Sequence, residues 1–288
     1  MTIKSRAAFA YASRMVRVYI SVDMEGVAGI SHTKPTIRGD AGYPDAVRLM
    51  NGEANAAIAG AFDGGANEVV VNDSHGQMYN LSPEELDPRA RLVLGKKPMS
   101  MVEAANDGKF DVALFIGYHA RAGHPRGTIA HTYTGKITLA LVNGRPITEA
   151  GMNGLYLGSL GIPIGMVSGD DALAEELADW LPWAERVVVK RGVSWQAADS
   201  LSPTKARELI KEGAKRAVAG RANMKVLELP APLLLRVQFS NAGQADFAAT
   251  IPGFERDGDR DITYSAPDPA TLFRAFLSAA RLAATADD

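Results

Sequence analysis

Short apolar runs alternate with longer alanine-rich segments over about the first two thirds of the chain. Nearly every position in each run is apolar, which is typical of strands buried on both faces of a parallel sheet. The segments between them have the length and composition of helices, so we predict an α/β fold with helices on both faces of the sheet. The predicted strands are 17–23, 67–73, 110–119, 162–169 and 185–193, and the predicted helices include 51–65, 151–161 and 170–180.

The pattern changes after Gly192. Ser202 and Pro203 predict a helix start, a strand pattern covers 233–240, and a last amphipathic helix follows. Residues 133–146 alternate around an Asn-Gly pair, as in a hairpin. The apolar face of the last helix carries Leu272, Phe273, Phe276, Leu277 and Ala280. We expect three parts, which are a disordered extension at 1–14, a main α/β domain at 15–190 and a smaller α+β domain at 191–288.

Composition limits the possible partners. The 288 residues carry 31 basic and 33 acidic side chains, for a formal net charge of −2. That balance argues against nucleic acid or an anionic membrane as the main partner. No apolar segment approaches the roughly 18 residues needed to span a bilayer. Residues 1–14 are basic and free of acidic side chains, but their apolar part is short for an export signal, so we expect a cytoplasmic location.

Three of the predicted strands end in metal-ligand residue types. Asp23 and Glu25 lie at the end of the first strand, Asp73 and His75 at the end of the second, and His119 at the end of the third. The carboxyl ends of neighbouring strands line one crevice in an open α/β sheet, so these side chains are expected to meet. The chain contains no cysteine, so a metal would be held by His, Asp or Glu.

The Asp23–Glu25 pair is the strongest single signal. In an extended backbone, the two carboxylates would project from the same side, about 7 Å apart. They repel each other unless a cation lies between them or one takes up a proton. The apolar run that leads directly into the pair favours a site over two solvated strand-end side chains.

All five histidines lie between His32 and His131. Taken alone, His75 fits a turn residue and His119 fits a half-buried histidine. Their recurrence at strand ends beside the carboxylate pair favours a shared site. His32 and His124 are expected to be loop residues, whereas His131 fits either a loop residue or an acid/base group.

Two carboxylates and two imidazoles without a thiolate suit zinc, manganese or cobalt. A third carboxylate would balance most of the charge of two divalent ions. Glu149 is a candidate, although a Glu at a helix start is also a favourable partner of the helix dipole. Two ions ~3.5 to 4 Å apart can polarise a carbonyl and lower the pKa of a shared water. Phosphate-loop, GxGxxG, GxSxG and HExxH motifs are absent, so nucleotide-binding, serine-hydrolase and zincin functions have no support.

Six separated motifs resemble, in order, those of the M55 family of metallopeptidases, a family of D-aminopeptidases. They are SVDMEG, VNDSH, GYHARAG, NGRPITEAGMN, SGDD and FSNAGQADFAATIPG, and the resemblance covers nearly the whole chain from Met15. It implies a three-layer α/β domain with a smaller α+β domain. It also implies a homodecamer of two stacked five-membered rings, with the active sites facing an internal chamber.

Carried over residue by residue, the resemblance implies a centre with two zinc ions in each subunit. Its metal ligands would be Asp23, Glu25, His75, His119 and Glu149. Asp23 would be the bridging carboxylate and Glu25 a terminal ligand, and His131 matches the family's catalytic histidine. The loop between His119 and His131 is one residue longer than the family pattern.

The predicted function is a metal-dependent aminopeptidase that releases N-terminal D-amino acids from short peptides. A metal-dependent amidase or phosphoesterase of other small substrates is an alternative. No cluster of Lys and Arg lies beside the ligand motifs, which argues against a phosphate substrate. Arg121 could still bind a phosphate, so the phosphoesterase remains an alternative. A non-catalytic peptide-binding accessory protein is a third hypothesis.

Overall fold

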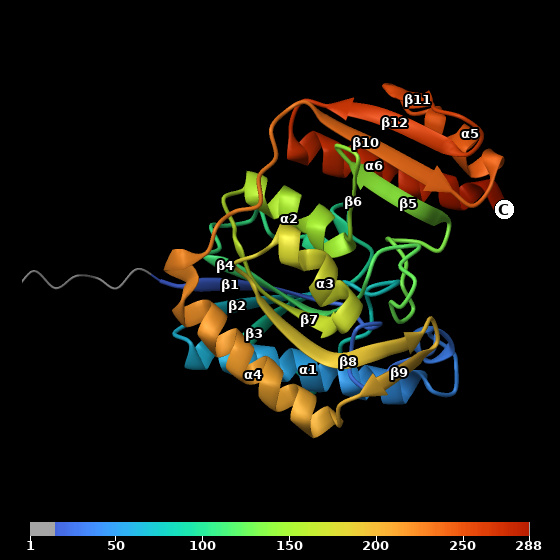
Figure 1. Cartoon of the computed structure of the whole chain (residues 1–288). Helices are drawn as coiled ribbons and strands as arrows, with labels where there is room; N and C mark the ends of the chain where they lie inside the picture. The colour runs from blue at the N-terminus through green and yellow to red at the C-terminus, as the bar shows by residue number, and fades with distance from the viewer. Residues whose placement is uncertain (1–14, 288) are drawn as a thin grey trace, which may run out of the picture.

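A seven-stranded sheet forms the centre of the computed structural model, which describes residues 15–287 (Figure 1). Its strand order is β3-β2-β1-β4-β7-β8-β9, and all neighbours are parallel except β8 and β9, which are antiparallel. The strands are β1 (Arg17–Val22), β2 (Glu68–Asp73), β3 (Ala90–Val93), β4 (Val112–Tyr118), β7 (Ile164–Asp170), β8 (Glu185–Ser194) and β9 (Ala197–Ser200). The predicted parallel α/β sheet is confirmed.

The register of three central strands places their ends at one edge of the sheet. Val22 at the end of β1 pairs with Asp73 of β2 on one side and with Ile116 of β4 on the other. Because the three strands are parallel and stop within a few residues of one another, the loops that follow them begin side by side. This edge is where the candidate ligands lie.

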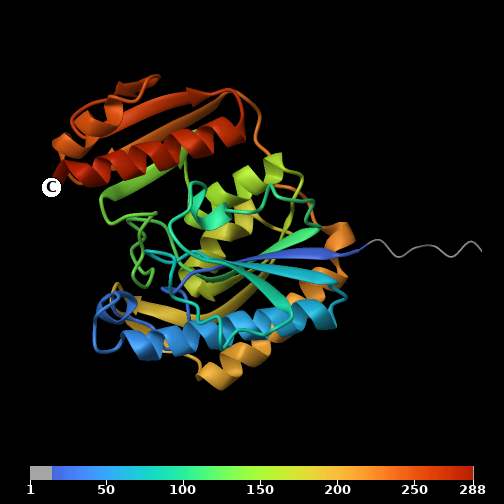
Figure 2. The ribbon, with the colours of Figure 1, turned by 180° about the vertical axis from the view of Figure 1, so that it is seen from behind.

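Helices cover both faces of this sheet (Figures 1 and 2). α1 (Tyr43–Asp63) and α4 (Pro203–Ala219) pack against each other on one face. α2 (Glu149–Ser159) and α3 (Asp171–Trp180) lie on the other face. The apolar positions of the strands divide accordingly, since Ile20 belongs to the core under α1 whereas Tyr19 belongs to the core under α2.

A second sheet of five antiparallel strands lies beyond α2, in the order β11-β12-β10-β5-β6. Its strands are β5 (Ile137–Val142), β6 (Arg145–Pro146), β10 (Leu233–Phe239), β11 (Phe254–Arg256) and β12 (Asp261–Ala266). α5 (Ala242–Ala249) and α6 (Pro269–Ala284) pack against each other, and α6 also contacts α2. The five residues predicted as the apolar face of α6 are all buried. Short 3-10 helices are η1 (Lys34–Thr36), η2 (Ser100–Val102), η3 (Arg221–Asn223) and η4 (Thr285–Asp287).

The domain boundary expected near residue 190 does not separate the elements of the two sheets. The predicted hairpin of β5 and β6 precedes this boundary but pairs with β10 of the second sheet. β9 and α4 follow the boundary, yet they belong to the seven-stranded layer. Each layer therefore contains elements from both sides of residue 190, and the division at this residue remains a prediction.

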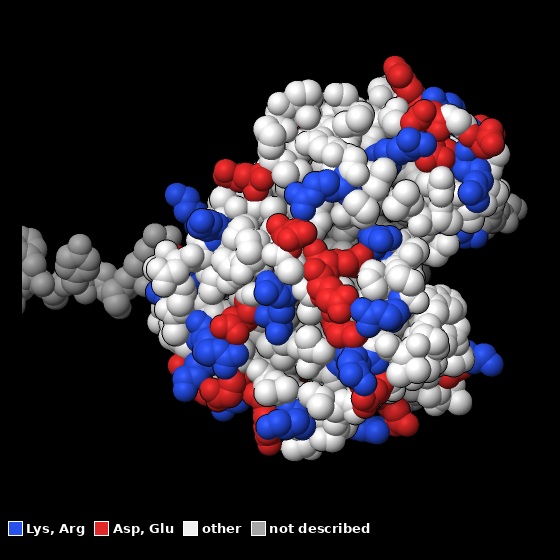
Figure 3. Space-filling view, viewed as in Figure 1, with Lys and Arg blue, Asp and Glu red and all other residues white. Residues whose placement is uncertain are grey.

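Charged side chains of both signs are interspersed on the face shown in Figure 3. The acidic residues over α3 pair with arginines of the loop after β4. Arg121 pairs with Glu176 at 2.7 Å and Arg126 with Glu175 at 2.9 Å. Within residues 15–287, no helix combines the length and the apolar character needed to cross a membrane. The extension expected at 1–14 lies outside the described residues.

Candidate metal centre

The turn after β1 carries the carboxylate pair. β1 ends at Val22, so Asp23 and Glu25 do not continue an extended strand, and the predicted projection from one strand face is wrong. The Met24 N–H donates to Asp23 Oδ1 at 2.8 Å, and the Val27 N–H donates to the Met24 carbonyl at 3.1 Å. These bonds close a turn that still brings both buried carboxylates into one pocket.

Gly26 allows this turn to approach β4. A Cβ atom at Gly26 would lie 1.8 Å from the carbonyl oxygen of Tyr118. The Gly26 N–H donates to the Gly117 carbonyl at 2.8 Å, which connects the turn to the end of β4. A side chain at this position would push the carboxylates away from His119.

His75 lies two residues after β2 and faces both carboxylates. Its Nδ1 lies 2.9 Å from Glu25 Oε2 and 3.3 Å from Asp23 Oδ1. Its Nε2 lies 2.8 Å from the carbonyl oxygen of Thr36, which can only accept, so Nε2 carries a hydrogen. This outer contact fixes the ring with Nδ1 toward the carboxylates, as backbone carbonyls do for metal-ligating histidines.

Asp73 does not join the cluster. Its carboxylate accepts hydrogen bonds from the backbone N–H groups of Asn80 and Leu81 at 2.6 and 2.7 Å. The Asn80 side chain also donates to Asp73 and to the His75 carbonyl. Asp73 therefore shapes the loop that presents His75.

His119 follows the last residue of β4 and is 1% exposed. Its Nδ1 carries the hydrogen and donates it to the Ala120 carbonyl at 2.9 Å. Nε2 is therefore unprotonated and has a free lone pair. Nε2 lies 3.5 Å from both Asp23 Oδ2 and Glu149 Oε1, yet it has no hydrogen-bond partner among the described residues. Buried polar atoms are nearly always paired, so we expect a cation between this atom and the carboxylates.

Glu149 is the first residue of α2, whose N-cap Thr148 accepts from the Gly151 N–H. The N–H of Tyr133 donates to Glu149 Oε1 at 2.6 Å. This backbone contact fixes the buried carboxylate opposite Asp23.

His131 stacks on His119, with ring centroids 4.2 Å apart. Its Nδ1 donates to the Ile129 carbonyl at 3.0 Å, and its Nε2 lies 3.7 Å from Glu149 Oε1. The His131 side chain is 26% exposed, in contrast to the almost fully buried His119. It is therefore the imidazole that a bound molecule can reach.

The pKa shifts reflect carboxylates crowded in a buried pocket. Burial raises the pKa of Asp23 well above its usual range, and the charge of Glu25 adds to the rise. Burial acts to raise the pKa of Glu25 as well, but His75 outweighs it and holds the value well below the usual range. Burial, followed by the charge of His131, lowers the pKa of His119, whose neutral form is the ligand form.

Positive charge is thus what the pocket requires, and its donor atoms form two sets. Asp23 Oδ1 faces His75 and Asp23 Oδ2 faces His119. One group of donor atoms within 4.8 Å of one another comprises Asp23, Glu25 and His119, and another comprises His119, His131 and Glu149. Carboxylate and imidazole donors of this kind fit zinc.

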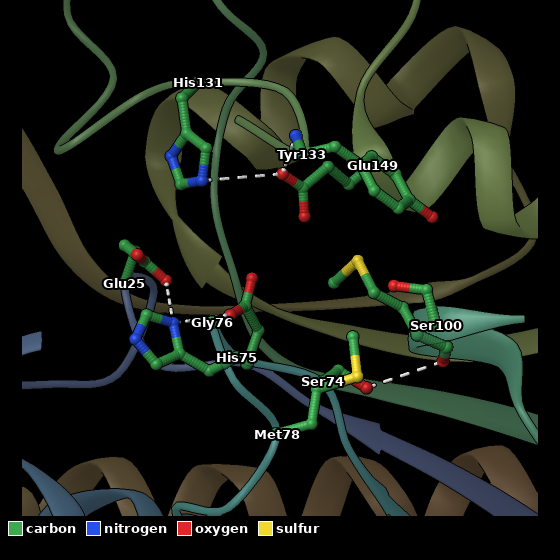
Figure 4. A pocket seen from close by; sticks show the side chains of 11 residues that line it. Glu25, Ser74, His75, Gly76, Met78, Ser100, His131, Tyr133 and Glu149 are labelled. Atoms are coloured by element: carbon green, nitrogen blue, oxygen red, sulfur yellow. Dashed lines mark hydrogen bonds and ion pairs between the residues drawn. The ribbon is translucent and has the colours of Figure 1, made fainter. Parts of the chain in front are cut away.

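Figure 4 shows Glu25 and His75 on one side of the pocket and His131 and Glu149 on the other. The cavity between them has a volume of about 140 Å³. Further wall residues are Ser74, Gly76, Met78, Ser100, Met101 and Tyr133. The structure therefore brings together all six predicted site residues. His32 and His124 lie outside this pocket, where each accepts a nearby backbone N–H.

Lys190 is a supporting residue that sequence reasoning missed. It lies in β8, is 1% exposed, and donates to the carbonyl oxygens of Glu25, Val27 and Ile30. A lysine inside the apolar run of β8 was the available signal, since buried lysines need partners. Thr36 and Tyr133 were also missed, because they act through backbone atoms, which residue type does not reveal.

Comparisons with known proteins agree with this geometry. Residues 16–278 match the Peptidase_M55 family model, described as D-aminopeptidase. A D-aminopeptidase of Bacillus subtilis (strain 168) is 38% identical over 270 residues, which cover 93% of this chain and 98% of that protein.

A solved structure gives the same result for the fold. It is the Zn-dependent D-aminopeptidase DppA from Bacillus subtilis, described as a self-compartmentalizing protease, and it matches with a TM-score of 0.89 at 38% identity. The match covers 93% of this chain and 98% of that one, and it confirms the fold class. On the extent of both matches, the chain belongs to the M55 peptidase family of D-aminopeptidases.

Proposed function

We propose that the protein is a zinc-dependent aminopeptidase that releases N-terminal D-amino acids from short peptides. The observation that carries this proposal is the buried Nε2 of His119, which faces two carboxylate oxygens at 3.5 Å without a hydrogen-bond partner among the described residues. The relatives described as D-aminopeptidases support the reaction and the stereochemistry. The Zn-dependence of the structural neighbour supports the metal.

Two zinc ions would share Asp23 as a bridging carboxylate, since its two oxygens face different histidines. Glu25 and His75 would complete the ligands of one ion, and His119 and Glu149 those of the other. Bound zinc supplies Lewis-acid polarisation of the scissile carbonyl and lowers the pKa of water to near neutrality.

His131 is the proposed general acid/base. It is the most exposed of the three clustered imidazoles, and its Nδ1–H bond to Ile129 leaves Nε2 directed into the pocket. Burial acts to lower the pKa of His131, but the charges of Glu149 and Glu25 outweigh it and raise the value above 6.5. The imidazolium can deliver a proton from Nε2 to the departing amine.

The substrate amine and the assembly belong to the same proposal. The free amino group of a peptide N-terminus would be held in this pocket by a carboxylate or by a metal ion. The neighbour's description as self-compartmentalizing supports a homo-oligomer, and we propose a decamer of two stacked five-membered rings in the cytoplasm. An enclosed chamber would admit short peptides and exclude folded proteins.

A substrate panel tests the function. The purified protein is assayed with D- and L-alanyl peptides and with p-nitrophenyl phosphate, before and after chelation and after zinc is restored. Release of D-alanine that chelator abolishes and zinc restores is the expected result. Hydrolysis of the phosphate ester alone, or hydrolysis unaffected by chelator, would contradict the proposal.

The structure also gives little support to the phosphoesterase alternative. The pairing of Arg121 with Glu176 leaves little free positive charge for a phosphate near the loop after β4.

A further inference from the structure

A larger cavity adjoins the metal pocket. Its volume is about 660 Å³, and it shares Gly76, Met78, Ser100 and Tyr133 with the wall of the smaller pocket. The loop after β3 forms one side, and the last turns of α6 form another. A peptide whose first residue lies at the carboxylate cluster therefore has a continuous path into this space.

The charged side chains that line the two cavities differ in sign. The metal pocket is lined by the carboxylates of Asp23, Glu25 and Glu149. The larger cavity has no Asp or Glu among its lining residues, and its charged side chains are Lys96, Lys97 and Arg281. A short peptide whose first residue lies in the metal pocket carries a carboxylate at its other end at neutral pH, and this group matches the cations of the larger cavity.

Two of these three cations are available to a ligand. Lys97 is buried and donates to the carbonyl of Asp73 at 2.6 Å, so it supports the loop that carries His75. Within residues 15–287, Lys96 has neither a hydrogen bond nor an ion pair from its side chain, and Arg281 has no carboxylate partner. Arg281 donates one N–H to the Lys97 carbonyl at 2.9 Å, which orients the guanidinium and leaves its other N–H groups free.

The remaining wall is largely apolar. Leu277, Ala280 and Ala284 come from one face of α6, and Met78 and Pro98 come from the opposing loops. Such a wall suits small aliphatic side chains, and Gln77, Ser100 and Thr134 add polar groups to it.

We propose that this cavity binds the part of the peptide that leaves after hydrolysis, with Lys96 and Arg281 pairing with its C-terminal carboxylate. The inference rests on the proposed aminopeptidase function and adds a reason for the restriction to short peptides. A peptide too long to place its carboxylate between these cations loses that interaction.

The test compares D-alanyl dipeptides and tripeptides that have a free C-terminal carboxylate with the same peptides as C-terminal amides. The kcat/KM of the preferred peptide acid should exceed that of its amide about tenfold, as expected for one charge-assisted contact. Lys96→Met and Arg281→Met should bring this ratio toward one. Arg281→Lys should restore part of it, because the charge remains while the fork of N–H groups is lost.

Lys225→Met is the matched control, since Lys225 is exposed and lines neither cavity, and it should keep the wild-type ratio. Equal kcat/KM values for acid and amide in the wild type would overturn the subsite while leaving the peptidase function intact. An acid preference that survives both Lys96→Met and Arg281→Met would also overturn it. Failure to hydrolyse either form would refute the proposed function itself, and the subsite with it.

Discussion

Replacing Lys190 with Met tests whether a residue that binds no metal holds the carboxylate turn in place. Met has a similar length and apolar stem, so the change removes the ammonium group with little change of volume. Lys190 donates to three carbonyls, those of Glu25, Val27 and Ile30. One of these belongs to a proposed ligand residue, so the effect should reach the metal.

The size of the effect follows from two opposing terms. The Val27 carbonyl keeps the Ile30 N–H at 3.2 Å, so the carbonyls of Glu25 and Ile30 are the two left without a partner, at a cost of about 2 kcal/mol each. Against this, burial lowers the pKa of Lys190 from 10.5 to about 8, so the ammonium itself costs about 3 kcal/mol at neutral pH. The net expectation is a loss of about 1 kcal/mol in the free energy of unfolding. Disturbing a contact that orients a ligand should also weaken zinc binding about 10- to 100-fold.

Urea denaturation of the metal-free protein measures the first quantity, and competition with a zinc-chelating dye measures the second. Lys225→Met again serves as the control for loss of an exposed lysine. A Lys190→Met protein with wild-type stability and wild-type zinc affinity would refute the supporting role of Lys190.

Three further predictions address the centre and its surroundings. His119→Ala should lower the zinc content from two ions per chain to about one by elemental analysis, and an unchanged content would exclude His119 as a ligand. His131→Asn should keep both ions but lower kcat about 10²- to 10⁴-fold, whereas His124→Asn on the same loop should match the wild type; equal kcat values for the two variants would remove the acid/base role. Burial raises the pKa of Glu53 from 4.5 to about 7, so its stabilisation is complete below pH 4.5 and is lost as the pH rises through about 7. Relative to Glu53→Gln, the wild type should lose up to about 3 kcal/mol over that range in denaturant titrations, and a constant difference would show that Glu53 has an ordinary pKa.

The main sheet and several of the site residues could be predicted because buried strands have a recognisable apolar pattern in the sequence. Strands covered on both faces read as apolar runs, and the ligand types stood where those runs ended, as at Asp23 and His119. Parallel register then places such ends together. This reasoning indicates that Asp23, His75 and His119 meet, but it wrongly includes Asp73, and Glu149 and His131 were assigned to the site by the family resemblance.

Other features depend on contacts that periodicity does not encode. An amphipathic pattern shows that α4 buries one face, but not that the face packs on α1. In the same way, the alternation of β5 predicts a hairpin without revealing that β10 is its neighbour. The turn at Asp23 depends on the approach to Tyr118 that Gly26 permits, which involves a segment remote in sequence.

The central claim is that Asp23 bridges two zinc ions held by the five proposed ligands. Anomalous diffraction at the zinc absorption edge, on crystals of the zinc-loaded protein, tests it most directly. Two peaks ~3.5 to 4 Å apart are predicted, one between Asp23 and His75 and the other between Asp23 and His119. A single peak, or two peaks that do not share Asp23, would contradict the account.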